Sequence, residues 1–167
     1  MMCHIHKARI MAIHHLTWSA TASALEDEEI IAQALDWLTG EGNGVEIERE
    51  KSYHGAIMHR ISCNITKKSP AVNSIPRMGE VVLNQILDSI EQRLDDENTL
   101  HIRLDLNELI KARITLGDPK DSPTVKCRIK LQVWPGEECI DVARKLLEDA
   151  IISAREQGLP IPPESLD

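Results

Sequence analysis

Strict alternation of apolar and polar residues is the feature that most limits what this chain of 167 residues can fold into. Between residues 124 and 134 every second residue is apolar, and Lys126, Arg128 and Lys130 lie between them. A period of two is typical of a β-strand with one buried face and one exposed face. The same pattern predicts further strands at residues 13–22, 45–53, 56–67 and 100–105. The sheet that they form should be covered on one face only.

Two hairpins are predicted from the spacing of these strands. The first joins residues 45–53 to 56–67 through a turn at His54-Gly55. The second joins a short strand at 114–116 to the strand at 124–134 through the turn region Gly117-Asp118-Pro119.

Three amphipathic segments predict helices that cover one face of the sheet. Ser23 and Glu26 have the spacing of a capping box at the start of the first helix, and Gly40 ends it. The second helix follows Pro76, after a loop at 67–70. The third helix is expected at residues 137–157.

The order of the elements predicts an α+β fold with two layers, a mainly antiparallel sheet and amphipathic helices packed on one face. We expect a single domain over residues 13–158. Residues 1–12 are expected to form a flexible N-terminal extension, with Met11 as an alternative start of translation, and residues 159–167 a proline-rich tail.

Composition narrows the class of protein further. Aromatic residues make up 2% of the chain, so the core must be aliphatic. No apolar run reaches the roughly 20 residues that span a bilayer, and no secretory signal is visible, so we expect no membrane partner. The four cysteines show no paired spacing, which favours reduced thiols in a cytoplasmic protein.

The net charge of −8 hides an uneven distribution of charge. Residues 21–50 carry nine acids and one base, whereas residues 101–130 carry seven bases and four acids. On the predicted strands the bases lie opposite the apolar side, and cations arranged in this way could contact the phosphates of a nucleic acid. The candidate binding residues are Arg60, Lys67, Lys68, Arg77, Arg103, Lys126, Arg128 and Lys130.

A different interpretation of the same charges stays open. Glu46, Glu48 and Glu50 alternate on the second strand and could pair with the bases across a solvated sheet face. Few aromatic residues are available to stack on bases, so any recognition of RNA should depend on its backbone and shape.

Catalytic and metal-binding motifs are not apparent in the sequence. Asp105 and Glu108 have the spacing of a carboxylate pair, but equally that of a helix cap, which we favour. His14 and His15 should point to opposite faces of a strand and so could not bind one ion together. Cys3, with two nearby histidines, has no second group of ligands to complete a zinc site. We therefore expect neither an enzyme nor a cofactor, and no metal site.

The glycine-rich segment 40–44 follows a predicted helix and does not precede one. It therefore indicates a helix end and a turn, not a phosphate-binding loop.

Three motifs resemble those of a known family. The strand IHHLTWSATAS leads into the acidic segment EDEE, Tyr53-His54-Gly55 opens a later strand, and LHIRLD spans residues 100–105. In these motifs, which fall within residues 13–134, the chain resembles the archaeal family of predicted exosome-associated RNA-binding proteins. The resemblance implies a fold similar to that of the ribosomal protein that binds 5S ribosomal RNA, and a role in RNA processing. Arg103 and Asp105 are the charged positions where a family motif matches directly.

The leading hypothesis is a noncatalytic protein that binds structured RNA through a cationic sheet face, with exosome or ribosome-related proteins as partners. The alternative is a protein–protein interaction or assembly module that uses its acidic helices, or a homodimer formed through a sheet edge, without RNA.

Overall fold

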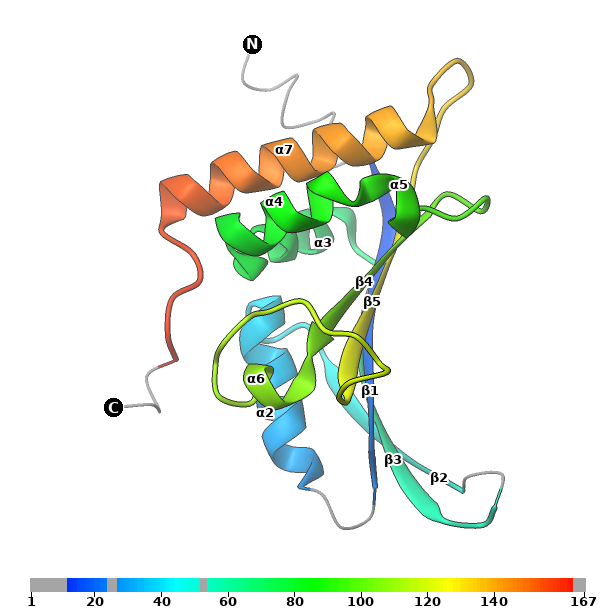
Figure 1. Ribbon diagram of the computed structural model, residues 1–167, viewed down its shortest axis with the longest axis vertical. Helices are drawn as coiled ribbons and strands as arrows, with labels where there is room; N and C mark the ends of the chain where they lie inside the picture. The colour runs from blue at the N-terminus through cyan, green and yellow to red at the C-terminus, as the bar shows by residue number, and fades with distance from the viewer. Residues whose placement is uncertain (1–11, 24–26, 52–53, 164–167) are drawn as a thin grey trace.

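Five antiparallel strands form one sheet in the computed structural model, which describes residues 12–23, 27–51 and 54–163 (Figure 1). Their order across the sheet is β2-β3-β1-β5-β4. The strands are β1 (Ile13–Ser23), β2 (Val45–Lys51), β3 (Ile57–Ile65), β4 (Thr99–Asp105) and β5 (Thr124–Leu131). The first predicted hairpin is confirmed, because β2 pairs with β3 throughout its length.

The described helices all lie on one side of the sheet, and none of them covers the opposite side (Figure 1). They are α2 (Glu28–Thr39), α3 (Lys68–Ser74), the 3₁₀-helix η1 (Ile75–Met78), α4 (Glu80–Asp88), α5 (Ile90–Arg93), α6 (Leu106–Leu109) and α7 (Cys139–Gln157). The predicted α+β fold, with helices on one face of an antiparallel sheet, is confirmed. Among the described residues, no helix is both long enough and apolar enough to cross a membrane.

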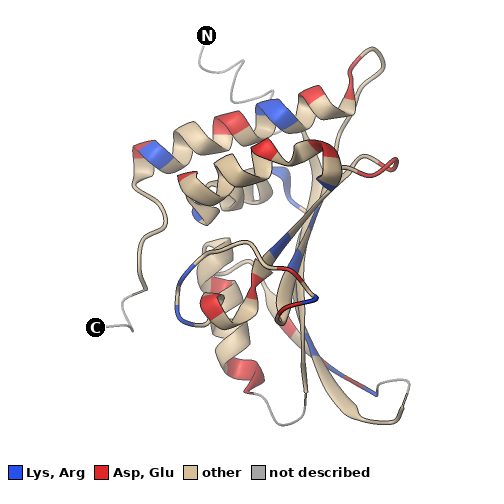
Figure 2. Ribbon diagram, in the orientation of Figure 1, with Lys and Arg blue, Asp and Glu red and all other residues tan. Residues whose placement is uncertain are grey.

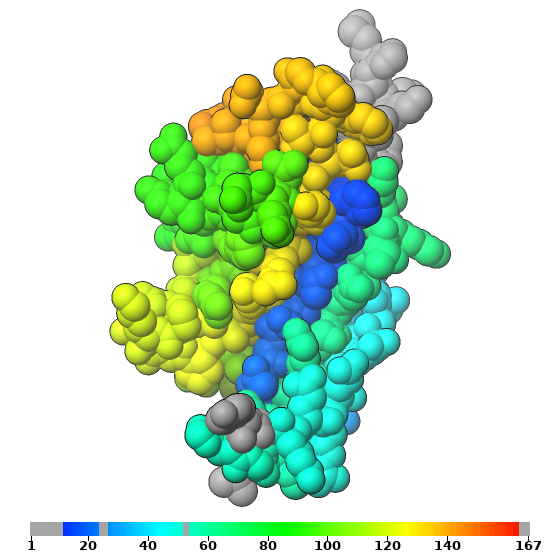
Figure 3. All heavy atoms as spheres, turned by 90° about the vertical axis from the view of Figure 1, so that its right-hand side faces the viewer, coloured from blue at the N-terminus to red at the C-terminus, as the bar shows by residue number. Residues whose placement is uncertain are grey.

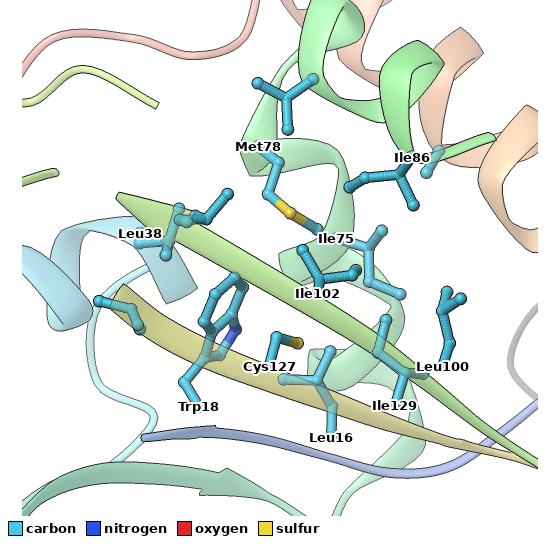
Figure 4. Packing of buried hydrophobic residues seen from close by; sticks show 14 of the residues in the cluster. Leu16, Trp18, Leu38, Ile75, Met78, Ile86, Leu100, Ile102, Cys127 and Ile129 are labelled. Carbon is cyan, nitrogen blue, oxygen red and sulfur yellow. The ribbon is translucent and has the colours of Figure 1, made fainter. Parts of the chain in front are cut away.

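The core between the two layers is aliphatic, as the composition predicts. Leu16, Ile102 and Ile129 project from the sheet and are fully buried. They face Ile75 and Met78 from the helical layer (Figure 4). Burial of this apolar face explains why one side of β1, β4 and β5 is apolar, whereas the other side is free to carry polar or charged residues.

The ends of α2 confirm one sequence prediction and correct another. Gly40 ends the helix with a φ of 101°, a left-handed conformation that glycine adopts without steric cost. The predicted capping box is wrong, because Ser23 belongs to β1. Asp27 is the N-cap, and its carboxylate accepts hydrogen bonds from the backbone N–H groups of Glu29 and Ile30. Glu26 lies outside the described residues.

The segment at residues 67–70, expected to be a loop, instead opens the helix α3, with Lys67 as its N-cap. Pro70 falls in the first turn of that helix, where a backbone N–H has no acceptor within the helix, so proline costs no hydrogen bond. The second predicted helix is in fact a series of short helices, because α4 ends at Asp88 and α5 follows at Ile90.

The second predicted hairpin is wrong. β5 does not pair with a strand at residues 114–116 but lies between β1 and β4. Leu116 forms only an isolated bridge with Leu104 of β4. Alternation shows that a segment is a strand, but it carries no information about which strand lies beside it, because pairing depends on the long-range register.

The histidine pair at the start of β1 also departs from prediction. Ile13 pairs with Leu131 and His15 with Lys130, so His14 is the extra residue of an irregularity in the ladder. The Nδ1 atoms of His14 and His15 are 3.3 Å apart, and their rings meet edge to face. A bulge breaks the alternation of side chains, which is why the two rings do not point to opposite faces.

Candidate nucleic-acid interface

The open face of the sheet is the surface formed by the polar residues of the five strands. In the view of this face, none of the helices that the structure describes covers it (Figure 3). Ser62, Ser19, Lys126 and Arg103 are opposite one another on successive strands from β3 to β4. The next row consists of Asn64, Thr17, Arg128 and His101.

Four cations gather on the β4–β5 half of the open face. Lys126 lies directly opposite Arg103, while Arg128 and Lys130 follow at alternate positions on β5. Residues directly opposite each other have Cβ atoms about 4.5–5.5 Å apart. We call these four residues the basic patch; part of it is visible as blue segments of β4 and β5 in Figure 2.

Electrostatic repulsion within the basic patch is not fully compensated. Partial burial lowers the pKa of Lys126, and the charges of Arg128 and Arg103 lower it further. A bound anion would relieve this repulsion. The cluster is therefore suited to a partner with several negative charges.

Hydrogen bonds orient two members of the basic patch. The Arg103 guanidinium donates to Thr124 Oγ1 at 2.9 Å, and the Lys130 ammonium donates to the backbone carbonyl of Glu97. Both acceptors are neutral, so the two side chains are positioned while their charge stays available.

The β1 side of the patch is polar but uncharged in its central rows. Thr17 donates to Asn64 Oδ1 at 3.0 Å. His15 lies opposite Lys130, and its pKa is lowered by burial and then by His14 and Lys130. At neutral pH this strand therefore neither neutralises the basic patch nor adds much charge to it.

The glutamates that could have cancelled the basic face are confined to one edge. Glu46, Glu48 and Glu50 lie on the outer strand β2, opposite Ser62, Arg60 and Met58. None of these three glutamates lies beside β5, because β3 and β1 separate β2 from β5.

Arg60 belongs to this acidic edge. It lies opposite Glu48 and forms an ion pair with Glu50 at 3.8 Å. The structure therefore brings Arg103, Lys126, Arg128 and Lys130 together but separates Arg60 from them.

The remaining predicted cations lie elsewhere. Lys67 and Lys68 are exposed at the start of α3, just beyond β3 and at the same end of the sheet as Lys130. Arg77 lies in the helical layer, where its guanidinium donates to the backbone carbonyls of Trp37 and Leu38 at 2.8–3.2 Å. Arg77 thus provides hydrogen-bond donors for the backbone carbonyls at the end of α2, and it is not part of the open face.

His101 is a residue of the open face that is not among the binding residues predicted from the sequence. Its Nε2 atom lies 2.7 Å from Asp95 Oδ2. This hydrogen bond, followed by smaller contributions that include the backbone N–H groups of Thr99 and Glu97, lowers the pKa of Asp95 to about 2. The position of His101 in the alternating segment LHIRLD predicts that its side chain lies on the polar side of the strand. Nothing in the sequence identifies Asp95 as the partner of His101.

The one carboxylate pair singled out from the sequence is structural. Asp105 caps α6 by accepting from the Glu108 backbone N–H at 2.9 Å, and it also accepts from Ser122 Oγ at 2.7 Å. Glu108 forms an ion pair with Arg113 at 3.5 Å. Across residues 12–23, 27–51 and 54–163, no three histidine, cysteine or acidic side chains are grouped so that they could hold a metal ion. Cys3 and its neighbouring histidines lie outside the described residues.

These features define an α+β protein with a helical layer on one side of its sheet and a basic patch on the other. Comparison with known proteins identifies the family. The sequence model of a family described as RNA binding matches residues 15–131, and the chain belongs to that family. No curated protein matches the chain.

Solved archaeal structures share the fold. A DUF54 protein from Archaeoglobus fulgidus is 23% identical, with a TM-score of 0.69 over 80% of this chain and 99% of the other. A DUF54 protein from Methanothermobacter thermautotrophicus is 22% identical, with a TM-score of 0.67 over 81% and 98%. A third, from Sulfolobus solfataricus, is 18% identical, with a TM-score of 0.61 over the same shares. At these identities the similarity shows the fold alone.

Proposed function

We propose that this protein binds structured RNA, without catalysing a reaction on it, through the basic patch on the open face. The observation that carries the proposal is the register of β4 and β5, which gathers Arg103, Lys126, Arg128 and Lys130 on a surface that is not covered by any helix among the described residues. Membership of a family described as RNA binding supports the same function.

The chemistry of the patch favours recognition of the RNA backbone. Lysine and arginine neutralise phosphates and release the counterions condensed on them, which makes binding strongly dependent on salt. The central rows of the open face offer hydroxyl and amide groups, such as Thr17, Ser19 and Asn64, and no phenylalanine, tyrosine or tryptophan. Contacts of this kind suit the sugar and phosphate groups of a folded RNA.

The resemblance noted in the sequence extends the proposal to a cellular context. A role in RNA processing, with exosome or ribosome-related proteins as partners, and a likeness to the ribosomal protein that binds 5S ribosomal RNA both follow from that resemblance. They are part of this proposal and are tested separately from RNA binding, by capture of partners with and without nuclease treatment.

RNA binding is tested by measuring the affinity for a hairpin RNA by fluorescence anisotropy between 50 and 300 mM KCl. The test variant replaces Lys126, Arg128 and Lys130 with Gln. If each side chain contacts one phosphate, the slope of log affinity against log salt should become shallower by about 2 to 3.

The matched control replaces Lys111, Arg144 and Lys145 with Gln, because these exposed cations lie outside the open face. It changes the net charge by the same amount and should leave the slope nearly unchanged. Equal effects of the two variants would show that only total charge matters and would refute the proposed face. A stable protein complex that forms without RNA, with no salt-dependent RNA binding, would instead favour the protein–protein module.

A further inference from the structure

Trp134 is an exposed tryptophan beyond the end of β5. Of the three tryptophans in the chain, Trp18 is buried in the core, and Trp37 is partly buried and donates from its indole N–H to the Ile161 carbonyl at 3.0 Å. Trp134 is 48% exposed. Tryptophan combines a large apolar ring with a polar N–H group, and it is enriched in binding interfaces for that reason.

The backbone of Trp134 is held in a tight turn. Its carbonyl accepts from the Glu137 N–H at 3.0 Å, and its own N–H donates to the Glu137 carboxylate at 2.8 Å. Pro135 and Gly136, with a φ of 91° at the glycine, occupy the central positions, as in a type II turn. A turn of this type positions the ring with little loss of backbone entropy when a ligand binds.

The turn continues the strand that carries most of the basic patch. The ladder extends past β5, because the Gln132 N–H donates to the Ala12 carbonyl at 2.8 Å. In Figure 3 the yellow of β5 leads up into the yellow-orange turn at the top of the open face. Trp134 lies four positions after Lys130, which is at most about 13 Å along an extended strand.

Two further groups lie at this end of the sheet. The irregularity in β1 places His14, which is exposed, with its Nδ1 3.3 Å from that of His15. His15 in turn lies opposite Lys130 on the open face. Histidine rings, like tryptophan, can stack on nucleobases, and the adjacent lysine can hold the neighbouring phosphate.

We infer that Trp134 stacks on an unpaired nucleobase of the bound RNA, next to the phosphates held by the basic patch. This inference rests on the proposed RNA binding and extends it: the preferred substrate is a folded RNA with a single-stranded extension that reaches beyond the phosphates at Lys130. An RNA base is favoured as the occupant over an apolar protein surface because a lysine and two histidines share this end of the sheet. Stacking on an aromatic side chain accepts any base, so the contact selects unpaired RNA and not a particular sequence.

The experiment compares two RNAs that share one hairpin, one with blunt ends and one with a short single-stranded extension. The full chain carries Trp37→Phe, so that Trp134 supplies the exposed tryptophan emission while buried Trp18 gives a constant background. We expect the extended RNA to quench the emission and the blunt RNA to quench it much less. Trp134→Leu should weaken binding of the extended RNA at least about fivefold, whereas Trp134→Phe, which keeps a ring, should weaken it less.

Three results would overturn the inference. If Trp134→Leu binds the extended RNA as tightly as the unmodified chain, while the Gln variant of Lys126, Arg128 and Lys130 still binds it weakly, the stacking contact is wrong and the proposed function stands. If Trp134→Leu weakens both RNAs equally, the contact is not specific to unpaired bases. If neither RNA binds in a salt-dependent manner, the proposed function and this inference fail together.

Discussion

The acidic edge of the open face provides a test of where the RNA lies. Replacing Glu46, Glu48 and Glu50 with Gln removes three negative charges from β2 and leaves the basic patch untouched. Because β3 and β1 separate β2 from β5, Glu46 is three strand spacings from Lys126. At about 4.8 Å per spacing, this is a separation of about 14 Å.

The effect expected from that separation is small. Two unit charges about 14 Å apart in water interact by about 0.3 kcal/mol. With a Debye length of about 10 Å at 0.1 M salt, screening reduces this to about 0.07 kcal/mol. Three glutamates together would then oppose a phosphate over β5 by about 0.2 kcal/mol, less than a twofold change in affinity.

The outcome differs sharply if the RNA instead lies across β3 and β2. Each glutamate would then have a phosphate of the RNA about 5 Å away. Each of these pairs would oppose binding by about 0.5 kcal/mol at 0.1 M salt. Removing all three charges would then raise the affinity about tenfold. The assay is the anisotropy titration at 0.1 M KCl with the hairpin RNA, and a gain of fivefold or more would refute the placement of RNA over β4 and β5. Loss of the Arg60–Glu50 pair should itself change stability little, because the side chains are 55% and 46% exposed.

Three further predictions concern stability. The pKa of Asp95 is lowered from 3.8 to about 2, chiefly by His101, so the wild-type chain gains stability above about pH 4 and loses it as the pH falls toward 2. Asp95→Asn should reduce this change of unfolding free energy with pH by less than about 1 kcal/mol, because the side chains of Asp95 and His101 are each 35% exposed. Urea unfolding from pH 2 to 5 measures the change. Ile102→Ala, at a fully buried position, should lower the free energy of unfolding by about 2–5 kcal/mol in the same assay at pH 7, and a loss below 1 kcal/mol would contradict the packing in Figure 4. A Cβ at Gly117 would lie 2.8 Å from the Asp105 backbone nitrogen, so Gly117→Ala should cost about 1–3 kcal/mol, and an unchanged thermal midpoint would count against this contact.

Much of the local structure could be predicted because it depends on residues close together in the chain. The alternation through residues 124–134 identifies β5 and assigns Lys126, Arg128 and Lys130 to its exposed side. The apolar spacing over residues 137–157 identifies α7 to within two residues. Each of these patterns repeats over several turns or residue pairs, so a single exception does not alter the prediction.

The errors fall where contacts between distant residues decide the structure. The residue that caps α2 depends on where β1 ends. Because β1 extends to Ser23, the helix starts later and Asp27 is its N-cap. The bulge at His14 is visible only in the pairing of β1 with β5. The sequence predicts that Arg77 is a binding cation. Its guanidinium instead donates hydrogen bonds to the backbone carbonyls at the end of α2, about 40 residues earlier in the chain.

The sequence by itself determined which side of β4 and β5 is charged, because alternation depends only on the period of an extended backbone and on the need to bury apolar side chains. Only the tertiary structure decided which charges are neighbours. By inserting β5 between β1 and β4, the fold places Lys126 opposite Arg103, and by placing β2 at the far edge it leaves Arg60 with the glutamates. Coulomb interactions fall with distance and screening, so the strand order, and not the net charge of −8, decides whether an anion can bind this face.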